Sequence, residues 1–164
     1  MTQRKQLPIG IQTFREIRQD NHYYIDKTDL ALSLIKHGKH YFLSRPRRFG
    51  KSLLLDTWKE LFEGNEPLFQ DLAIHKQWDW SVKYPVIRFS FGSKNYNSTK
   101  GLEDSLHTQL SHLEASFGVT KQFNDASGRF ADLIVQIHKQ TNQPLVILID
   151  EYDKPILDAI KQPD

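Results

Sequence analysis

A short basic stretch, "SRPRRFGKS" at residues 44–52, contains the residue types that bind phosphate. It ends in Gly50-Lys51-Ser52, as the phosphate-binding pattern G-x-x-x-x-G-K-[ST] does, but Arg45 stands where that pattern has its first glycine. At the amino end of a helix, free backbone N–H groups and the helix dipole attract anions, and Lys51 adds a full positive charge. Ser52 offers a hydroxyl to Mg²⁺ in such a loop. The stretch therefore predicts a phosphate-binding loop with an altered entrance.

The altered entrance changes how the loop can meet a phosphate. Arg45 disfavours the backbone conformation that glycine allows, and Pro46 fixes its own φ and removes one N–H donor. We expect the amides from Arg48 and Phe49 onward to face the phosphates, with the side chains of Arg47 and Arg48 as additional donors. The alternative for these arginines is an ordinary place on the solvated surface.

The second stretch with possible chemistry is "PLVILIDE" at residues 144–151, an apolar run that ends in two carboxylates. Such a run is typical of a central parallel strand that is covered on both faces. Ligands of open α/β sheets bind at the carboxyl ends of these strands. We expect Asp150 to hold Mg²⁺, directly or through water, and Glu151 to act as the general base on an attacking water. The alternative is a strand that simply ends in polar residues.

Hydrophobic periodicity predicts the elements that position both stretches. Residues 40–44 ("HYFLS") predict a buried strand before the loop, residues 51–64 predict a helix after it, and residues 85–92 ("PVIRFSFG") predict another strand. Helices are predicted at three further places: residues 26–38, where Asp26 or Thr28 is the expected cap, residues 102–117 and residues 130–137. Alternating strands and helices indicate an α/β sheet with helices on both faces.

Composition narrows the possible classes of protein. The 164 residues suffice for a single domain over residues 1–164, and a net charge of +2 does not by itself indicate nucleic-acid binding. The absence of cysteine excludes disulfides, thiolate zinc sites and cysteine nucleophiles, so a metal would need carboxylate or histidine ligands. No apolar run is long enough for a signal peptide or a membrane span. We therefore expect a cytoplasmic protein without a membrane partner.

Several segments together resemble one known family, the bacterial AAA-ATPase-like proteins. They are "LPIGIQTFREI", "YYIDKTDLALSLI", "FLSRPRRFGKSLLL", "LFEGNEPLFQDLAI", "YPVIRFSFG" and "ILIDEYDKPILDAI". The resemblance covers about residues 7–161 and is most specific in the R-P-R-R-F-G-K-S loop and the D-E-Y-D-K-P segment. In that family the arginine-proline entrance is the usual form of the loop. Its members resemble P-loop ATPases and often carry a PD-(D/E)XK nuclease-like domain downstream.

The resemblance implies a P-loop NTPase-like α/β domain that binds ATP and Mg²⁺. Gly50, Lys51 and Ser52 match the Walker A residues that bind phosphate and Mg²⁺, and Asp150 with Glu151 matches Walker B. Such ATPases continue with at least two more strands, so we expect the sheet to be incomplete at its carboxyl-terminal end. ATP hydrolysis is expected of the full-length form, coupled to a partner or to a downstream domain.

Two other functions agree with the same residues. One is a nucleic-acid-binding module in which Arg45, Arg47, Arg48 and Lys51 contact the phosphate backbone. The other is a regulatory domain that binds nucleotide without turnover. Salt-dependent binding to DNA or RNA would distinguish the first, and ATP binding without phosphate release would distinguish the second.

Overall fold

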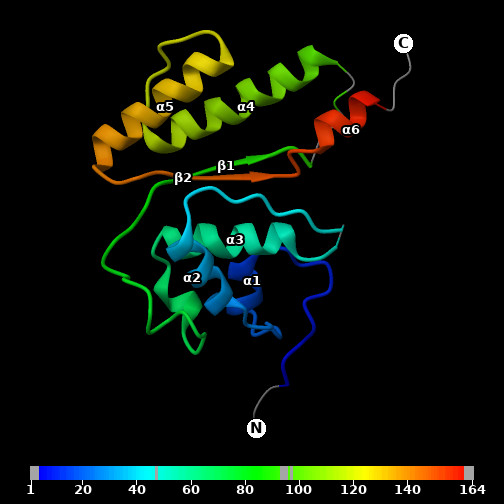
Figure 1. Ribbon diagram of the computed structural model, residues 1–164, viewed down its shortest axis with the longest axis vertical. Coiled ribbons are helices and arrows are strands. Elements are labelled where there is room, and N and C mark those ends of the chain that lie inside the picture. Colours follow the sequence, from blue (N-terminus) through cyan, green and yellow to red (C-terminus); the bar gives the residue numbers. More distant parts are fainter. Residues whose placement is uncertain (1–3, 47, 93–95, 97, 161–164) are drawn as a thin grey trace. The chain divides into compact units, whose positions relative to one another are not determined.

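The computed structural model describes residues 4–46, 48–92, 96 and 98–160. It is a mixed α/β structure with two compact units, one up to Lys83 and one from Tyr84 onward (Figure 1). Each unit has its own hydrophobic core. The first unit contains α1 (Phe14–Gln19), α2 (Thr28–His37), α3 (Lys51–Phe62) and the short 3-10 helix η1 (Glu66–Phe69). The second contains β1 (Val86–Ser90), α4 (Thr99–Phe117), α5 (Ala126–Thr141), β2 (Val146–Asp150) and α6 (Lys154–Ile160). Among the described residues, no helix is both long and apolar enough to cross a bilayer.

The core of the first unit is centred on Phe14, which is fully buried at the start of α1. Its ring lies 5.1 Å from the ring of Tyr24 and 4.9 Å from that of Phe69, measured between centroids. Leu61 of α3 belongs to the same buried cluster. The backbone N–H of Phe14 donates to Asp56 Oδ2 at 2.7 Å. Apolar packing and this hydrogen bond together attach α1 to α3.

A buried carboxylate on α3 strengthens the attachment of α1. Glu60 is only 3% exposed, and Arg15 donates to it through Nε (3.3 Å) and Nη2 (2.7 Å). Asn65 Nδ2 also donates to Glu60 Oε2 at 2.7 Å. A buried charge is tolerated when it is paired and hydrogen-bonded, as Glu60 is here. The face of α3 that carries Glu60 is thus fixed within the unit.

The start of α2 is joined to the segment after η1 through Asp26. Its Oδ1 accepts from the backbone N–H and the hydroxyl of Thr28, and its Oδ2 accepts from the N–H of Ala73 at 2.7 Å. Burial raises the pKa of Asp26, but the hydrogen bonds from Ala73 and Thr28 together lower this pKa by more than burial raises it. The pKa of Asp26 is therefore below its ordinary value. The predicted helix is confirmed, but the expected cap is wrong, because Lys27 occupies the N-cap position without a side-chain cap hydrogen bond and Thr28 is the first helical residue.

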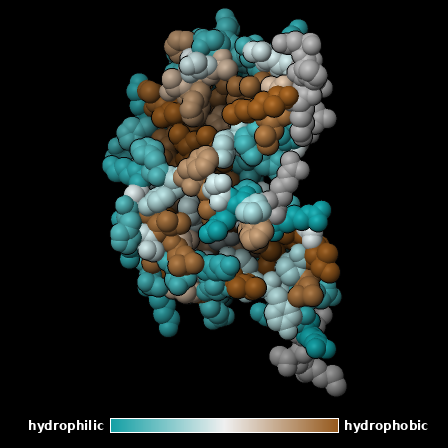
Figure 2. Space-filling view, turned by 45° about the vertical axis from the view of Figure 1, so that its right-hand side comes forward, coloured by the Kyte–Doolittle hydropathy of each residue, from teal (hydrophilic) through white to brown (hydrophobic). Residues whose placement is uncertain are grey.

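The strand predicted at residues 40–44 is wrong. These residues form an exposed segment without regular structure, and Tyr41 and Phe42 are 46% and 71% exposed. Figure 2 shows hydrophobic residues at the surface of the molecule as well as hydrophilic ones. A strand persists only where its backbone pairs with a neighbouring strand. Within the described part of the first unit, the pairing is limited to an isolated bridge between Gln6 and His22.

The second unit is built on the parallel pair β1 and β2, both close to their predicted positions. The register joins Val86 to Val146 and continues to Ser90 and Asp150. Helices α4 and α5 lie along one side of the two strands (Figure 1). They cover Ile87 and Phe89 of β1, which are buried in a cluster with residues of both helices.

The expectation that residues 144–151 form a strand covered on both faces is wrong. Ile147 and Ile149 of β2 are 41% and 47% exposed, although their register partners Ile87 and Phe89 are buried. Register partners share a face of a parallel sheet, so α4 and α5 cover this face over β1 and leave it open over β2. The described residues pair no second strand with β2. The apolar run therefore predicts the strand correctly, but it does not predict whether the faces of the strand are covered.

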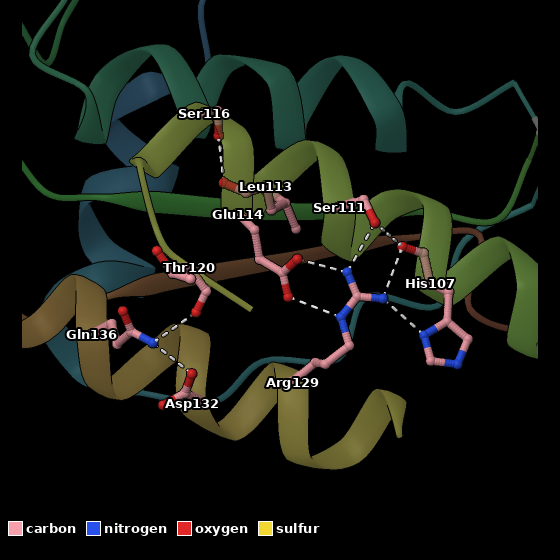
Figure 3. Close-up of polar contacts among 9 residues, drawn as sticks. All are labelled: His107, Ser111, Leu113, Glu114, Ser116, Thr120, Arg129, Asp132 and Gln136. Atoms are coloured by element: carbon pink, nitrogen blue, oxygen red, sulfur yellow. Dashed lines mark hydrogen bonds and ion pairs between the residues drawn. The ribbon is translucent and has the colours of Figure 1, made fainter. Parts of the chain in front are cut away.

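Helices α4 and α5 have strong end signals. Ser98 and Asp125 cap their amino ends by accepting from the N–H groups of Gly101 and Gly128, and left-handed Gly118 ends α4. Between the helices, Arg129 donates to both carboxylate oxygens of Glu114 (Figure 3). Both helices predicted from the apolar periodicity are confirmed.

Candidate functional site

The basic loop of the first unit leads directly into α3. Arg48 and Gly50 both have left-handed backbones, with φ of 66° and 73°, and α3 begins at Lys51. Glycine adopts this conformation without penalty, whereas arginine pays of order 1 kcal/mol for it. Left-handed residues at these two positions turn the chain sharply before the helix. The predicted order of loop and helix is confirmed, and the strand before them is not formed.

The amino end of α3 is not capped by a side chain. Gly50 occupies the cap position, and its carbonyl accepts the first helical hydrogen bond from Leu54 at 2.9 Å. Since the first N–H groups of a helix have no partner within the helix, they form an anion-binding position together with the dipole. Lys51 and Ser52 are half-buried at this end. The expected phosphate-binding geometry of the helix start is therefore available.

The side chain of Lys51 turns back onto the loop that precedes it. Its Nζ donates to the carbonyl oxygens of Arg45 at 2.7 Å and of Pro46 at 3.1 Å. Both acceptors are neutral, so a phosphate could compete for the same ammonium group with a charge-assisted bond. The unusual entrance residues thus contribute backbone acceptors for the lysine, a role that the sequence pattern did not indicate.

Of the other residues expected to contribute to the loop, Arg47 lies outside the described residues, and the rest are exposed. Arg48 is exposed, and the ring of Phe49 is 69% exposed. An exposed guanidinium next to the uncapped helix end leaves the electrostatics of this end positive.

The carboxyl end of β2 carries the acidic pair of the second unit. Asp150 is the last residue of β2, and its side chain is 7% exposed. Arg88 of β1 donates from Nη2 to Asp150 Oδ2 at 3.4 Å. The backbone pairing continues one step further, where the N–H of Phe91 donates to the Asp150 carbonyl at 3.1 Å. The position of Asp150 at a strand end is as predicted.

Glu151 follows in a left-handed conformation with φ of 52° and an exposed side chain. Its carboxylate lies against the backbone of Gly92. A Cβ added to Gly92 would be 2.8 Å from Glu151 Oε2 and 3.0 Å from Oε1, so only glycine leaves room for the carboxylate in this position. Gly92 follows β1 as Glu151 follows β2, and the carboxyl ends of parallel strands lie at one edge of the sheet.

Sequence reasoning missed Arg88 and Gly92. One signal was present, because Arg88 is a cation inside an apolar, β-branched strand pattern. The contacts themselves depend on the register between β1 and β2, which the sequence does not give. The structure thus brings together Gly50, Lys51 and Ser52 in the first unit, and Asp150 and Glu151 with two residues of the neighbouring strand in the second.

Each unit by itself offers groups of the kind that bind phosphate or magnesium. The uncapped helix end and a lysine held by neutral carbonyls suit a phosphate. Oxygen atoms are the ligands that Mg²⁺ prefers, and the first unit offers the hydroxyl of Ser52 while the second offers the carboxylate of Asp150. No cluster of three or more His, Cys, Asp or Glu side chains that could hold a metal occurs in the described ranges. A Mg²⁺ ion would thus need phosphate and water oxygens as well, which is usual for this metal.

Comparison with known proteins gives the family. Residues 8–164 match the family described as predicted AAA-ATPase. The chain is 52% identical over 162 residues to a protein of Azotobacter chroococcum mcd 1 described as an uncharacterized protein in the vnfD 5' region. That similarity covers 98% of this chain and 31% of the relative, so the chain spans about a third of the relative's length. No solved structure matches the chain. Because the family match extends over nearly the whole sequence, the chain belongs to the family of predicted AAA-ATPases.

Proposed function

We propose that the chain is an ATP- and Mg²⁺-binding domain with a P-loop NTPase-like fold. The observation that carries this proposal is the uncapped start of α3, where Gly50 is left-handed and Lys51 donates to the two neutral carbonyls of the loop. An anionic phosphate is a stronger acceptor than either carbonyl. The family to which the chain belongs supports the same function.

In this proposal the first unit binds the phosphates. The N–H groups of the first turn of α3 and the Lys51 ammonium contact the β- and γ-phosphates, as in other phosphate-binding loops. Arg47 and Arg48 add side-chain donors, and the amides of Phe49 and Gly50 face the same phosphates. These donors stabilise the negative charge of the bound nucleotide.

The metal is assigned to oxygen ligands. Ser52 contributes its hydroxyl and Asp150 its carboxylate, directly or through water. A bound Mg²⁺ neutralises charge on the β- and γ-phosphates. Glu151 is assigned as the general base that accepts a proton from the attacking water, and its carboxylate is exposed as this role requires.

Turnover and coupling belong to the longer protein in this proposal. The relative of known sequence is about three times as long as the matched region, so further segments could respond to ATP binding or hydrolysis. We propose that the domain couples ATP to a partner or downstream domain, for which a nuclease-like domain or nucleic acid is a candidate. A domain that binds ATP without turnover is the alternative, and phosphate release from the full-length protein distinguishes the two.

Calorimetric titration with Mg²⁺ and a slowly hydrolysed ATP analogue tests the site. Lys51→Ala is expected to lose at least tenfold in affinity, because it removes a charge that contacts the phosphates. Lys36→Ala, at an exposed position in the last turn of α2, is the matched control and should bind like the wild type. Equal affinity of Lys51→Ala and wild type would contradict the assignment of Lys51 to phosphate binding. Salt-sensitive DNA or RNA binding without any ATP affinity would instead favour the nucleic-acid-binding function.

A further inference from the structure

We propose that Arg88 is the resident counter-ion of Asp150 and competes with Mg²⁺ for its carboxylate, so that Arg88 sets the metal affinity of the nucleotide site. This inference rests on the proposed function, because it takes Asp150 as a metal ligand. It adds a residue of the neighbouring strand that neither the motifs nor the family match assigns.

The sheet register places the two side chains on one face. Arg88 is opposite Leu148, and Asp150 is opposite Ser90, one residue pair further along the parallel strands. Residues two apart on a strand point to the same side, so Arg88 reaches diagonally across to Asp150. The contact joins Nη2 to Oδ2 at 3.4 Å. The register therefore makes the contact a property of the paired strands.

The geometry of this ion pair is that of an exchangeable contact. Charge-assisted N–H···O bonds are commonly about 2.7–2.9 Å long, so the 3.4 Å contact between Arg88 and Asp150 is loose. Arg129 and Glu114 in the same unit provide the contrast, since they form two hydrogen bonds at 2.9 and 2.6 Å. The Arg129 pair has the geometry of a structural link, whereas the contact between Arg88 and Asp150 is longer than a normal charge-assisted hydrogen bond.

The side chains of Arg88 and Asp150 differ in how far they are buried, and therefore in how easily each can move. The Asp150 side chain is 7% exposed and the Arg88 side chain is 29% exposed. A buried carboxylate requires a nearby cation or several donors, and Arg88 supplies a cation in the absence of metal. A partly exposed arginine can move its charge into solvent at little cost, because its long side chain keeps the head hydrated. Asp150 is thus the fixed partner and Arg88 the one that can leave.

Two cations cannot share the Asp150 oxygens without repelling each other. When Mg²⁺ binds, the guanidinium must withdraw from Oδ2 or weaken the metal's attraction to it. Neighbouring charges change the proton affinity of a carboxylate by roughly ten- to a thousandfold, and the same electrostatics act on a metal ion. Because Arg88 is partly exposed, the effect on metal affinity should be at the low end, about tenfold. Loss of the arginine charge should accordingly tighten metal binding, whereas ordinary structural damage would weaken it.

The test is Mn²⁺ binding in the presence of ADP, followed by electron paramagnetic resonance on the full-length protein. Arg88→Gln and Arg88→Met are expected to bind Mn²⁺ about tenfold more tightly than the wild type, and Arg88→Lys to stay close to it. Lys139→Gln removes the same charge from an exposed position on α5 and should leave the affinity unchanged. Two charge-removing variants are used so that the inference stays testable if one of them does not fold.

The outcomes separate this inference from the proposed function. Unchanged or weaker Mn²⁺ binding in a folded Arg88→Gln or Arg88→Met protein overturns the role of Arg88, even where nucleotide binding depends on Lys51. Wild-type Mn²⁺ binding that is insensitive to ADP, to Lys51→Ala and to Asp150→Asn overturns the proposed function itself, and this inference with it.

Discussion

Arg129 of α5 and Glu114 of α4 form a buried ion pair with two hydrogen bonds, Nε to Oε1 at 2.9 Å and Nη2 to Oε2 at 2.6 Å (Figure 3). Their side chains are 3% and 9% exposed. The same guanidinium donates to the hydroxyl of Ser111 and to Nδ1 of His107, each at 2.9 Å. Because arginine has only donors, Nδ1 of His107 is the acceptor in this contact. One side chain of α5 thus joins three positions of α4.

Removing one partner of this pair should strongly destabilise the second unit. In Glu114→Ala the Arg129 guanidinium stays buried without its carboxylate, which typically costs about 3–5 kcal/mol. Replacing both residues by apolar ones, as in Glu114→Leu with Arg129→Met, should recover much of this loss because no buried charge remains. Urea unfolding of the three proteins measures the differences. A double variant as unstable as Glu114→Ala would contradict this explanation.

The same pair should make stability depend on acid. The hydrogen bonds from Arg129 lower the pKa of Glu114 below its ordinary value of 4.5, and burial raises it by less. As pH falls, the unfolded chain therefore binds a proton at this position before the folded chain does. The contribution of Glu114 is complete above about pH 4.5 and is lost as pH falls through the lower, folded pKa.

Urea unfolding at pH 7 and below pH 4 tests this dependence. The stability difference between wild type and Glu114→Gln should shrink in acid, since protonation makes the wild-type side chain resemble the variant's neutral one. Glu103→Gln, at an exposed position of α4, is the control and should show little difference at either pH. A wild-type advantage over Glu114→Gln that persists unchanged in strong acid would refute the assigned role of the carboxylate.

Gly50→Ala should affect both stability and nucleotide binding. Gly50 has φ of 73°, and a Cβ there would meet nothing within 4 Å, so the cost is backbone strain of about 1–2 kcal/mol. Gly118→Ala is a matched control, because Gly118 has φ of 64° and is equally open at the end of α4. Both variants should lose similar stability in thermal unfolding. Only Gly50→Ala should also weaken calorimetric binding of the ATP analogue, and equal binding by both would count against the loop.

The sequence predicts helices of this chain better than the surroundings of its strands. Helix α4 follows from apolar residues between Leu102 and Phe117, because helical hydrogen bonds are local and one apolar stripe suffices. A strand depends on partners far away in the sequence. Residues 40–44 have strand-like composition but no regular structure, and Ile149 of the apolar β2 is half exposed. Composition gave the tendency to form strands, and pairing decided the outcome.

The residues of the candidate site also fall into two groups, those that the sequence predicts and those that only the structure reveals. Residues adjacent in the sequence, such as Lys51 and Ser52 or Asp150 and Glu151, can be recognised from their motifs. Arg88 could not be, since its contact with Asp150 requires the register of two strands separated by two helices. The carbonyl acceptors of Lys51 are backbone atoms, so the sequence carries no direct sign of them. Spatial neighbours at a sheet edge are therefore what the structure adds.

Gly92→Ala should change catalysis more than folding. The added Cβ would approach Oε2, Cδ and Oε1 of Glu151 to 2.8, 2.9 and 3.0 Å, which is too close for the present side-chain position. These atoms are the end of a flexible, exposed side chain, so Glu151 can rotate away and stability should change by less than about 1 kcal/mol. The rotation would move the proposed general base out of place.

The measurement is phosphate release by the full-length protein, with nucleotide affinity followed in parallel. A displacement of about 1 Å in a catalytic group can cost roughly a hundredfold in rate, so Gly92→Ala should lose at least tenfold while it binds the ATP analogue normally. Gly101→Ala is the control, because its Cβ would meet only Ser98 Oγ at an ordinary 3.4 Å and the helix tolerates alanine. If Glu151→Gln abolished release and Gly92→Ala left it unchanged, the carboxylate would not need the space that Gly92 provides, and the base would act from another rotamer.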